Sequence, residues 1–108
     1  MLGEEEEVIL LREREAVVLR TVQLYKRVHV RQLPELLTET GVFLGGINPS
    51  RELKKLEECG YLQSSFHPKR RGLTMQLRVY RITKRGEKAL KEYQKHLRRL
   101  ADFLERFS

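Results

Sequence analysis

The most chemically distinctive stretch of the sequence is a basic run between His67 and Gly86. These twenty residues hold no Asp or Glu and seven cations, namely Lys69, Arg70, Arg71, Arg78, Arg81, Lys84 and Arg85. Cationic side chains at this density attract phosphate groups, so the run favours a polyanionic partner, most often nucleic acid. Charge alone leaves a second interpretation open, which is a solvated basic surface on a thermostable protein.

A second group of polar side chains precedes the run, in the segment NPSRELKKLEECG. Asn48 is a favourable helix N-cap, Pro49 suits the first helical position and Gly60 suits the end of the helix. Leu53 and Leu56 share one face, and polar residues lie on and beside the opposite face. Arg pairs well with guanine and Asn with adenine, so base or phosphate contacts are predicted for Asn48, Ser50, Arg51, Lys54 and Lys55. Asn48 and Ser50 also have a competing role at the helix start.

Length and charge limit the class of protein. A chain of 108 residues is one domain, residues 1–108, and it can bury a core without disulfides. Its net charge of +7 is uneven, because residues 1–47 hold six Lys or Arg against eight Asp or Glu, whereas residues 48–108 hold sixteen against seven. No apolar run is long enough for a membrane span, and the acidic N-terminus is unlike a signal peptide, so we expect a cytoplasmic protein without membrane contact.

Catalytic and metal-binding motifs are not found in the sequence. It has no Gly-rich phosphate loop and no nucleophile motif, which argues against an enzyme and against a bound cofactor. Cys59, His29, His67 and His96 do not lie at metal-ligand spacing, so no metal is expected. A cysteine near a helix end is most often a small buried residue, and this is the interpretation for Cys59.

Hydrophobic periodicity predicts mainly helices with one small β-hairpin, an α+β fold. In chain order we expect a helix over 4–27, a short strand over 28–31, helices over 32–40 and 48–59, strands over 61–67 and 74–83 joined by the turn PKRRG, and a last helix from Thr83 to about Phe107. In the second strand of the hairpin neither face is purely polar, so the inward face stays open.

Two long helices indicate an oligomer. Apolar residues of the first helix lie on more than one side, which predicts cover from a partner chain. The last helix, residues 86–107, carries a seam with spacings of 3, 4, 3, 4 and 3, formed by Leu90, Tyr93, Leu97, Leu100, Leu104 and Phe107. We therefore expect a homodimer in which these helices form the interface. The alternative is a monomer whose seam folds back onto its own first helix.

Two segments, RELKKLEECGYL and VYRITKRGEKAL, resemble the recognition helix and the strand-to-last-helix junction of winged helix-turn-helix transcription regulators. The PadR type is most similar and the MarR type is a near relative, over about residues 12–107. The resemblance implies that 48–59 enters the major groove and that the hairpin tip, with Lys69, Arg70 and Arg71, is a wing on phosphate or the minor groove. The loop over 41–47 is longer than a tight helix-turn-helix turn, which leaves the start of the recognition helix open.

These observations together predict a sequence-specific regulator that binds double-stranded DNA as a homodimer. DNA contacts are expected from the helix and wing residues above and from Arg78, Lys84 and Arg85, although Arg78 and Arg81 can equally pair with Glu57 or Glu58. Lys84 and Arg85 stand in the first turn of a helix, where the dipole disfavours cations, which favours a role toward phosphate. The alternative function is a winged-helix module that binds proteins in a transcription or replication complex. No pattern in the sequence indicates an operator, a regulated gene or an effector ligand.

Overall fold

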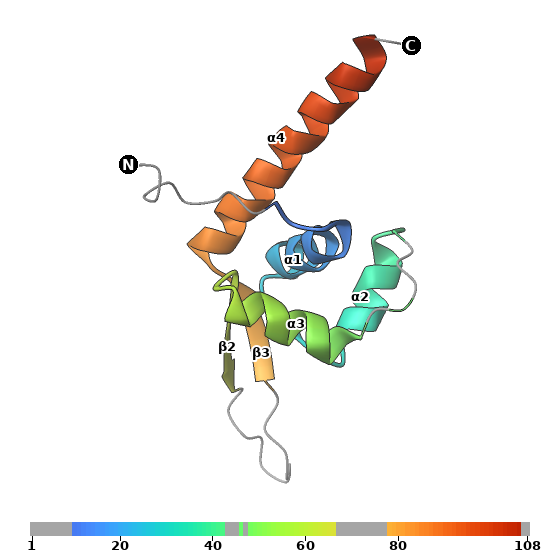
Figure 1. Cartoon of the computed structure of the whole chain (residues 1–108). Coiled ribbons are helices and arrows are strands. Elements are labelled where there is room, and N and C mark those ends of the chain that lie inside the picture. Colours follow the sequence, from blue (N-terminus) through green and yellow to red (C-terminus); the bar gives the residue numbers. More distant parts are fainter. Residues whose placement is uncertain (1–9, 43–45, 47, 67–77, 107–108) are drawn as a thin grey trace, which may run out of the picture.

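The structure is a computed structural model, and it describes residues 10–42, 46, 48–66 and 78–106. Four helices and a three-stranded antiparallel sheet make up this part of the chain (Figure 1). Their bounds are α1 Glu13–Tyr25, β1 Val28–His29, α2 Leu33–Glu39, α3 Pro49–Glu58, β2 Leu62–Phe66, β3 Arg78–Ile82 and α4 Lys84–Arg106. The predicted α+β class and element order are confirmed.

Helix α1 is the central element of the core. It packs against α2, α3, α4 and β3, so neighbours surround it on several sides (Figure 1). Val18, Leu19 and Val22 are completely buried, and Thr21 between them satisfies its hydroxyl by donating to the Val17 carbonyl at 2.8 Å. The same chain therefore covers the middle of α1 on several sides. Leu24 and Tyr25, near the end of this helix, are 53% and 42% exposed, so cover from a partner chain stays a prediction for that end.

The start of α1 also differs from the prediction. Residues 1–9 lie outside the described part, but residues 10–12 are not helical and the helix begins at Glu13. Arg12 is extended, and the Glu15 carboxylate accepts a hydrogen bond from the Arg12 backbone N–H at 2.7 Å. A carboxylate three residues into the helix thereby satisfies a backbone donor that the helix leaves unpaired. The described helix has 13 residues and is shorter than the periodicity suggested.

The sheet has the order β1-β3-β2, with β3 in the centre. Tyr80 of β3 lies opposite Val28 of β1 and Ser64 of β2. Val79 and Tyr80 are neighbours on opposite faces of the strand, yet both are buried. Both faces of β3 are therefore covered at its middle, which explains why alternation along the strand did not identify one inward face.

A junction of four residues joins α3, β2, β3 and α4. Gly60 ends α3 with a φ of +82°, a conformation that glycine adopts without strain, and the Tyr61 N–H donates to the Leu56 carbonyl at 3.0 Å. Thr83 binds this turn twice, because its N–H donates to the Tyr61 carbonyl at 3.0 Å and its hydroxyl donates to the Gly60 carbonyl at 2.7 Å. The same hydroxyl accepts from the Gly86 N–H at 3.0 Å, which confirms Thr83 as the cap of α4. The junction therefore fixes α4 relative to α3.

Helix α4 divides into a buried and a projecting part. Leu90 is only 5% exposed and belongs to the core of its own chain, with Ala89 and Tyr93 packed against that core. Leu90 is therefore not available to a partner, which corrects its assignment to an intermolecular seam. The C-terminal part of the helix extends away from the body (Figure 1), and there Leu97, Leu100 and Leu104 are 45%, 43% and 60% exposed. Among the described helices, none is long and apolar enough to cross a membrane.

Gly86 offers a test of the junction. A Cβ atom at this position would lie 2.3 Å from the Tyr61 carbonyl oxygen and 2.8 Å from Cγ1 of Ile82, so the backbone must shift. In an unconstrained helix Gly→Ala stabilises by about 1 kcal/mol. Here we expect Gly86→Ala to destabilise the protein by about 1–3 kcal/mol in urea unfolding, because overpacking outweighs helix propensity. Lys95→Ala, at an exposed site of α4, is the control and should change stability by less than about 0.5 kcal/mol. A stabilised Gly86→Ala variant would contradict the junction.

Candidate nucleic-acid interface

Helix α3 presents one buried face and one exposed face. Leu53 and Leu56 are completely buried against α1 and β2, which fixes the rotation of the helix about its axis. Burying each of these side chains contributes about 1.5–3 kcal/mol. The opposite face carries the exposed residues Ser50, Arg51, Lys54, Lys55 and Glu58. The sequence-predicted recognition residues therefore share one solvent-facing surface, which we call the α3 face.

Asn48 begins α3 as predicted. Its Oδ1 accepts a hydrogen bond from the Arg51 backbone N–H at 3.2 Å, and Pro49 follows in the first helical position. This places the helix start after the 41–47 loop, while Phe43 and Leu44 of that loop lie outside the described residues. Capping uses one lone pair of the Asn48 side-chain oxygen, and the two amide N–H groups stay available to another partner. Asn48 is mainly a structural residue here.

Lys55 links the α3 face to α1. Its Nζ lies 2.9 Å from Oε2 of Glu15, whose other oxygen accepts from Arg12. Burial raises the pKa of Glu15, but the Arg12 hydrogen bond and the Lys55 ammonium outweigh burial, so the net pKa is lowered from its ordinary value. The pair holds two helices together at the edge of the α3 face. Lys55 is therefore partly committed inside the fold, whereas Arg51 and Lys54 have no ion pair within the described residues.

Arg78 is held at the base of the hairpin. Its guanidinium carbon lies 4.9 Å from the centre of the Phe66 ring, and Nη1 is 3.8 Å from Oε1 of Glu57. Glu57 also accepts a hydrogen bond from the Ser64 hydroxyl. Of the two roles that the sequence left open for Arg78, pairing within the fold is the one present. Arg81, two residues further along β3, is exposed.

The cations at the start of α4 lie beside the junction. Arg85 places its guanidinium carbon 5.8 Å from the centre of the Tyr61 ring, and its side chain lies next to Gly60. Lys84 is exposed and lines a cavity between α1 and α4. Arg85 is thus near the C-terminal end of α3, while Lys84 belongs to a different surface. The sequence predicted one shared role for Lys84 and Arg85, but as neighbours on a helix they point to different sides of it.

Several residues named from the sequence either lie outside the described part of the chain or differ from expectation. The wing cations Lys69, Arg70 and Arg71 fall outside the described residues, as does Phe107 of the α4 seam. Cys59 is exposed at the end of α3, so its interpretation as a small buried residue is wrong. A helix end that turns outward through Gly60 leaves the preceding side chain in solvent. Phe103, which falls outside the predicted seam, is 55% exposed on the projecting part of α4.

Comparison with known proteins gives matches among solved structures. No family model matches the chain, and no curated protein matches it. The conserved protein TM0937, described as a potential transcriptional factor of unknown function, is 29% identical over 86% of this chain and 82% of its own, with a TM-score of 0.69. A PadR-like transcription factor from Bacteroides fragilis gives a TM-score of 0.74 at 15% identity, covering 88% and 89% of the two chains. The chain has a PadR-like winged-helix fold.

A MarR relative extends the comparison. The zinc-responsive MarR family member ZitR of Lactococcus lactis is 21% identical over 97% of this chain and 67% of its own, with a TM-score of 0.57. At these identities the likeness concerns the fold, and it agrees with the resemblance of the α3 and junction segments to both groups.

The Glu15–Lys55 pair predicts a pH-dependent contribution to stability. Since the pKa of Glu15 is lowered in the folded state, its contribution is complete above the ordinary value of 4.5 and is lost as pH falls through the lowered value. We expect Glu15→Gln to reduce the free energy of unfolding at pH 7 by up to about 1 kcal/mol, because the pair is partly exposed. The difference from the unsubstituted protein should shrink in acid.

Denaturant unfolding between pH 7 and pH 3 measures this difference. Glu13→Gln is the control, since Glu13 stands in the same helical turn and is exposed. A difference that stays constant over the whole pH range would show that the Glu15 carboxylate has no preferential partner in the folded state.

Proposed function

We propose that this chain is a DNA-binding transcription regulator in which α3 is the recognition helix. The observation that carries the proposal is the α3 face, a solvent-facing surface with Arg51 and Lys54 unpaired within the described residues, on a helix whose position and rotation are fixed. The PadR-like fold and the excess of cations in residues 48–108 support the same function. Duplex DNA presents one phosphate charge per roughly 1.7 Å of its axis, so such a surface gains affinity from counterion release.

In this proposal the first two turns of α3 lie in the major groove. Ser50, Arg51 and Lys54 stand on the exposed side of these turns, where they reach base edges or phosphates. Arg51 is the candidate for base readout, because its guanidinium donates two parallel hydrogen bonds to guanine. Glu58, further along the same face, limits close approach of phosphate at the far end of the helix. In this proposal the N-terminal half of α3 therefore makes the DNA contacts.

The wing would supply further phosphate contacts from Lys69, Arg70 and Arg71. Support comes from sequence, since these cations stand in a run without acidic residues that follows directly after β2. Arg85 adds positive charge beside the end of α3. Arg78 contributes mainly by holding Phe66 and Glu57 at the base of the hairpin, and its distance from Glu57 leaves the ion pair weak.

A homodimer through the projecting part of α4 completes the proposal. Leu97, Leu100 and Leu104 form an exposed apolar stripe, and Phe103 lies beside it. An α-helix of 23 residues is about 35 Å long, so most of its second half extends beyond the body. Pairing two such stripes in an isologous contact would bury them and place two recognition helices on one side. Half-sites about 34 Å apart, in an inverted repeat, would suit such a dimer.

Arg51→Ala tests the recognition role of α3. If Arg51 contacts a base in two hydrogen bonds, discrimination at one position of a selected site should fall by about 1–3 kcal/mol, while binding to random duplex changes less. Fluorescence anisotropy with a site selected from random DNA measures both affinities. Arg99→Ala, which removes the same charge from the exposed part of α4, is the control and should leave discrimination unchanged. An absence of any duplex binding at low salt would instead favour a protein-binding module.

Leu97→Asp with Leu100→Asp tests the dimer. Charges in a buried interface are costly, so the double variant should be a monomer at tens of micromolar, by order of magnitude, and should lose operator affinity. Lys95→Asp with Arg99→Asp introduces a larger charge change on the opposite face of α4 and should leave the mass unchanged. Light scattering coupled to size-exclusion chromatography measures the mass. A monomeric unsubstituted protein would exclude the α4 dimer.

A further inference from the structure

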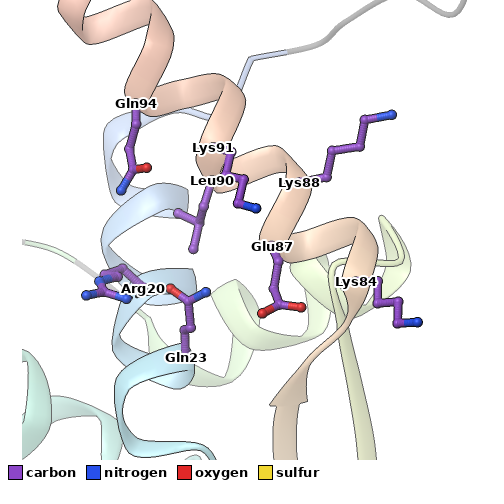
Figure 2. A pocket seen from close by; sticks show the side chains of 8 residues that line it. All are labelled: Arg20, Gln23, Lys84, Glu87, Lys88, Leu90, Lys91 and Gln94. Carbon is purple, nitrogen blue, oxygen red and sulfur yellow. Dashed lines mark hydrogen bonds between the residues drawn. The ribbon is translucent and has the colours of Figure 1, made fainter.

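A cavity on the side of α1 that faces α4 lies apart from the α3 face. Its volume is about 410 Å³, within the range of roughly 300–1,000 Å³ usual for small-molecule sites. Figure 2 shows side chains from both helices around it, with Arg20 and Gln23 on α1 and the remaining side chains on α4. Nothing in the proposed DNA contacts uses this cavity, although Lys84 belongs to its lining.

Charge in the cavity is strongly one-sided. Four cations and a single carboxylate line it, and the cations are Arg20, Lys84, Lys88 and Lys91. None of these cations forms an ion pair within the described residues. Glu87 lies four residues before Lys91, a spacing that allows an ion pair, yet the two do not pair. Arg20 of α1 and Lys91 of α4 bring uncompensated positive charge to the cavity from two helices, and a bound anion would compensate it.

The donors of the cavity are partly positioned. Nη1 of Arg20 donates to Oε1 of Gln23 at 2.6 Å, which holds the guanidinium while most of its five N–H groups stay available. The amide of Gln94 adds another donor from α4. Leu90 forms an apolar wall, and because it is buried in the core it is fixed in place. Lys84 and Lys88 extend to the outer side of α4 in Figure 2, so they strengthen the positive field more than they grip a ligand.

We infer that this cavity binds a small, multiply charged anion, a phosphate ester or a polycarboxylate, between Arg20 of α1 and Lys91 of α4. A fork of guanidinium donors suits the oxygen pairs of either group, and charge-assisted hydrogen bonds are about twice as strong as neutral ones. The ligand would join α1, the central helix of the core, to α4, which projects from the core. If the proposed DNA-binding function holds, an occupied cavity would hold α4 against α1 and favour one spacing of the two recognition helices.

Calorimetric titration of the full chain tests the site directly. Sodium pyrophosphate and citrate, used separately at constant low ionic strength, are the probes, and they distinguish phosphate from carboxylate chemistry. At least one should bind saturably with one site per chain. Arg20→Gln with Lys91→Gln should weaken that binding at least about tenfold, because two charge-assisted contacts are lost. Lys95→Gln with Arg99→Gln removes the same charge from α4 outside the cavity and should weaken it less than about twofold.

Several outcomes would overturn the inference. Binding that does not saturate, or that both double variants weaken equally, would reflect the general positive field of the chain. Arg20 and Lys91 are exposed, so the double variant should keep its melting temperature, and Lys91→Arg should retain binding because it keeps the charge. If neither probe binds but Arg20→Gln with Lys91→Gln loses affinity for random duplex, the cavity contacts DNA backbone and the inference is wrong. Anion binding by a chain that binds no duplex would leave it standing and exclude the proposed function instead.

Discussion

The close approach of Gly86 to the Tyr61 carbonyl is the constraint on which the arrangement of this molecule depends. It brings the first turn of α4 against the turn that ends α3, at a distance that no side chain at position 86 permits. Thr83 holds the same place through three hydrogen bonds, two of them to the Gly60–Tyr61 turn. Since α3 carries the exposed polar face and α4 carries the exposed apolar stripe, this junction sets the geometry between the two surfaces. A change of a few tenths of an ångström there would be amplified along a helix of 23 residues.

Around the junction the chain separates its charges by role. Lys55 and Arg78 have acidic partners inside the fold, at 2.9 Å and 3.8 Å, and they hold α3 to α1 and to the hairpin. Arg51 and Lys54 have no such partner within the described residues and face solvent. The cations of the α1–α4 cavity form a third set, remote in sequence from the α3 face. A basic sequence of this kind therefore contains structural cations, which pair with a partly buried carboxylate, and others whose charge stays available to a ligand.

Much of the element order could be predicted because its signals are local. Asn48, Pro49 and Gly60 specify the start and end of α3 through backbone hydrogen bonds within a few residues, and Thr83 does the same for α4. The start of α1 could not be found in this way. The Glu15 cap acts on an Arg12 backbone N–H, and arginine is not a usual N-cap, so the four glutamates near the N-terminus gave a stronger but misleading signal. Leu90 was assigned to the dimer interface because the spacing of apolar residues in a heptad seam is the same whether the helix packs on its own core or on a second chain.

The sequence by itself determined the fold class, the rotation of α3 and the cations that face away from Leu53 and Leu56, because helical periodicity assigns faces without knowledge of neighbours. Only the tertiary structure decided which of those cations are used inside the fold. Glu15 and Lys55 are forty residues apart, and Arg20 and Lys91 are seventy-one apart, so no spacing rule relates them. Tertiary packing likewise decided that the middle of α1 is covered by its own chain and that α4 packs on the core only as far as Tyr93. Contacts between distant segments depend on how whole helices and strands pack, and this packing depends on all the side chains of the core together.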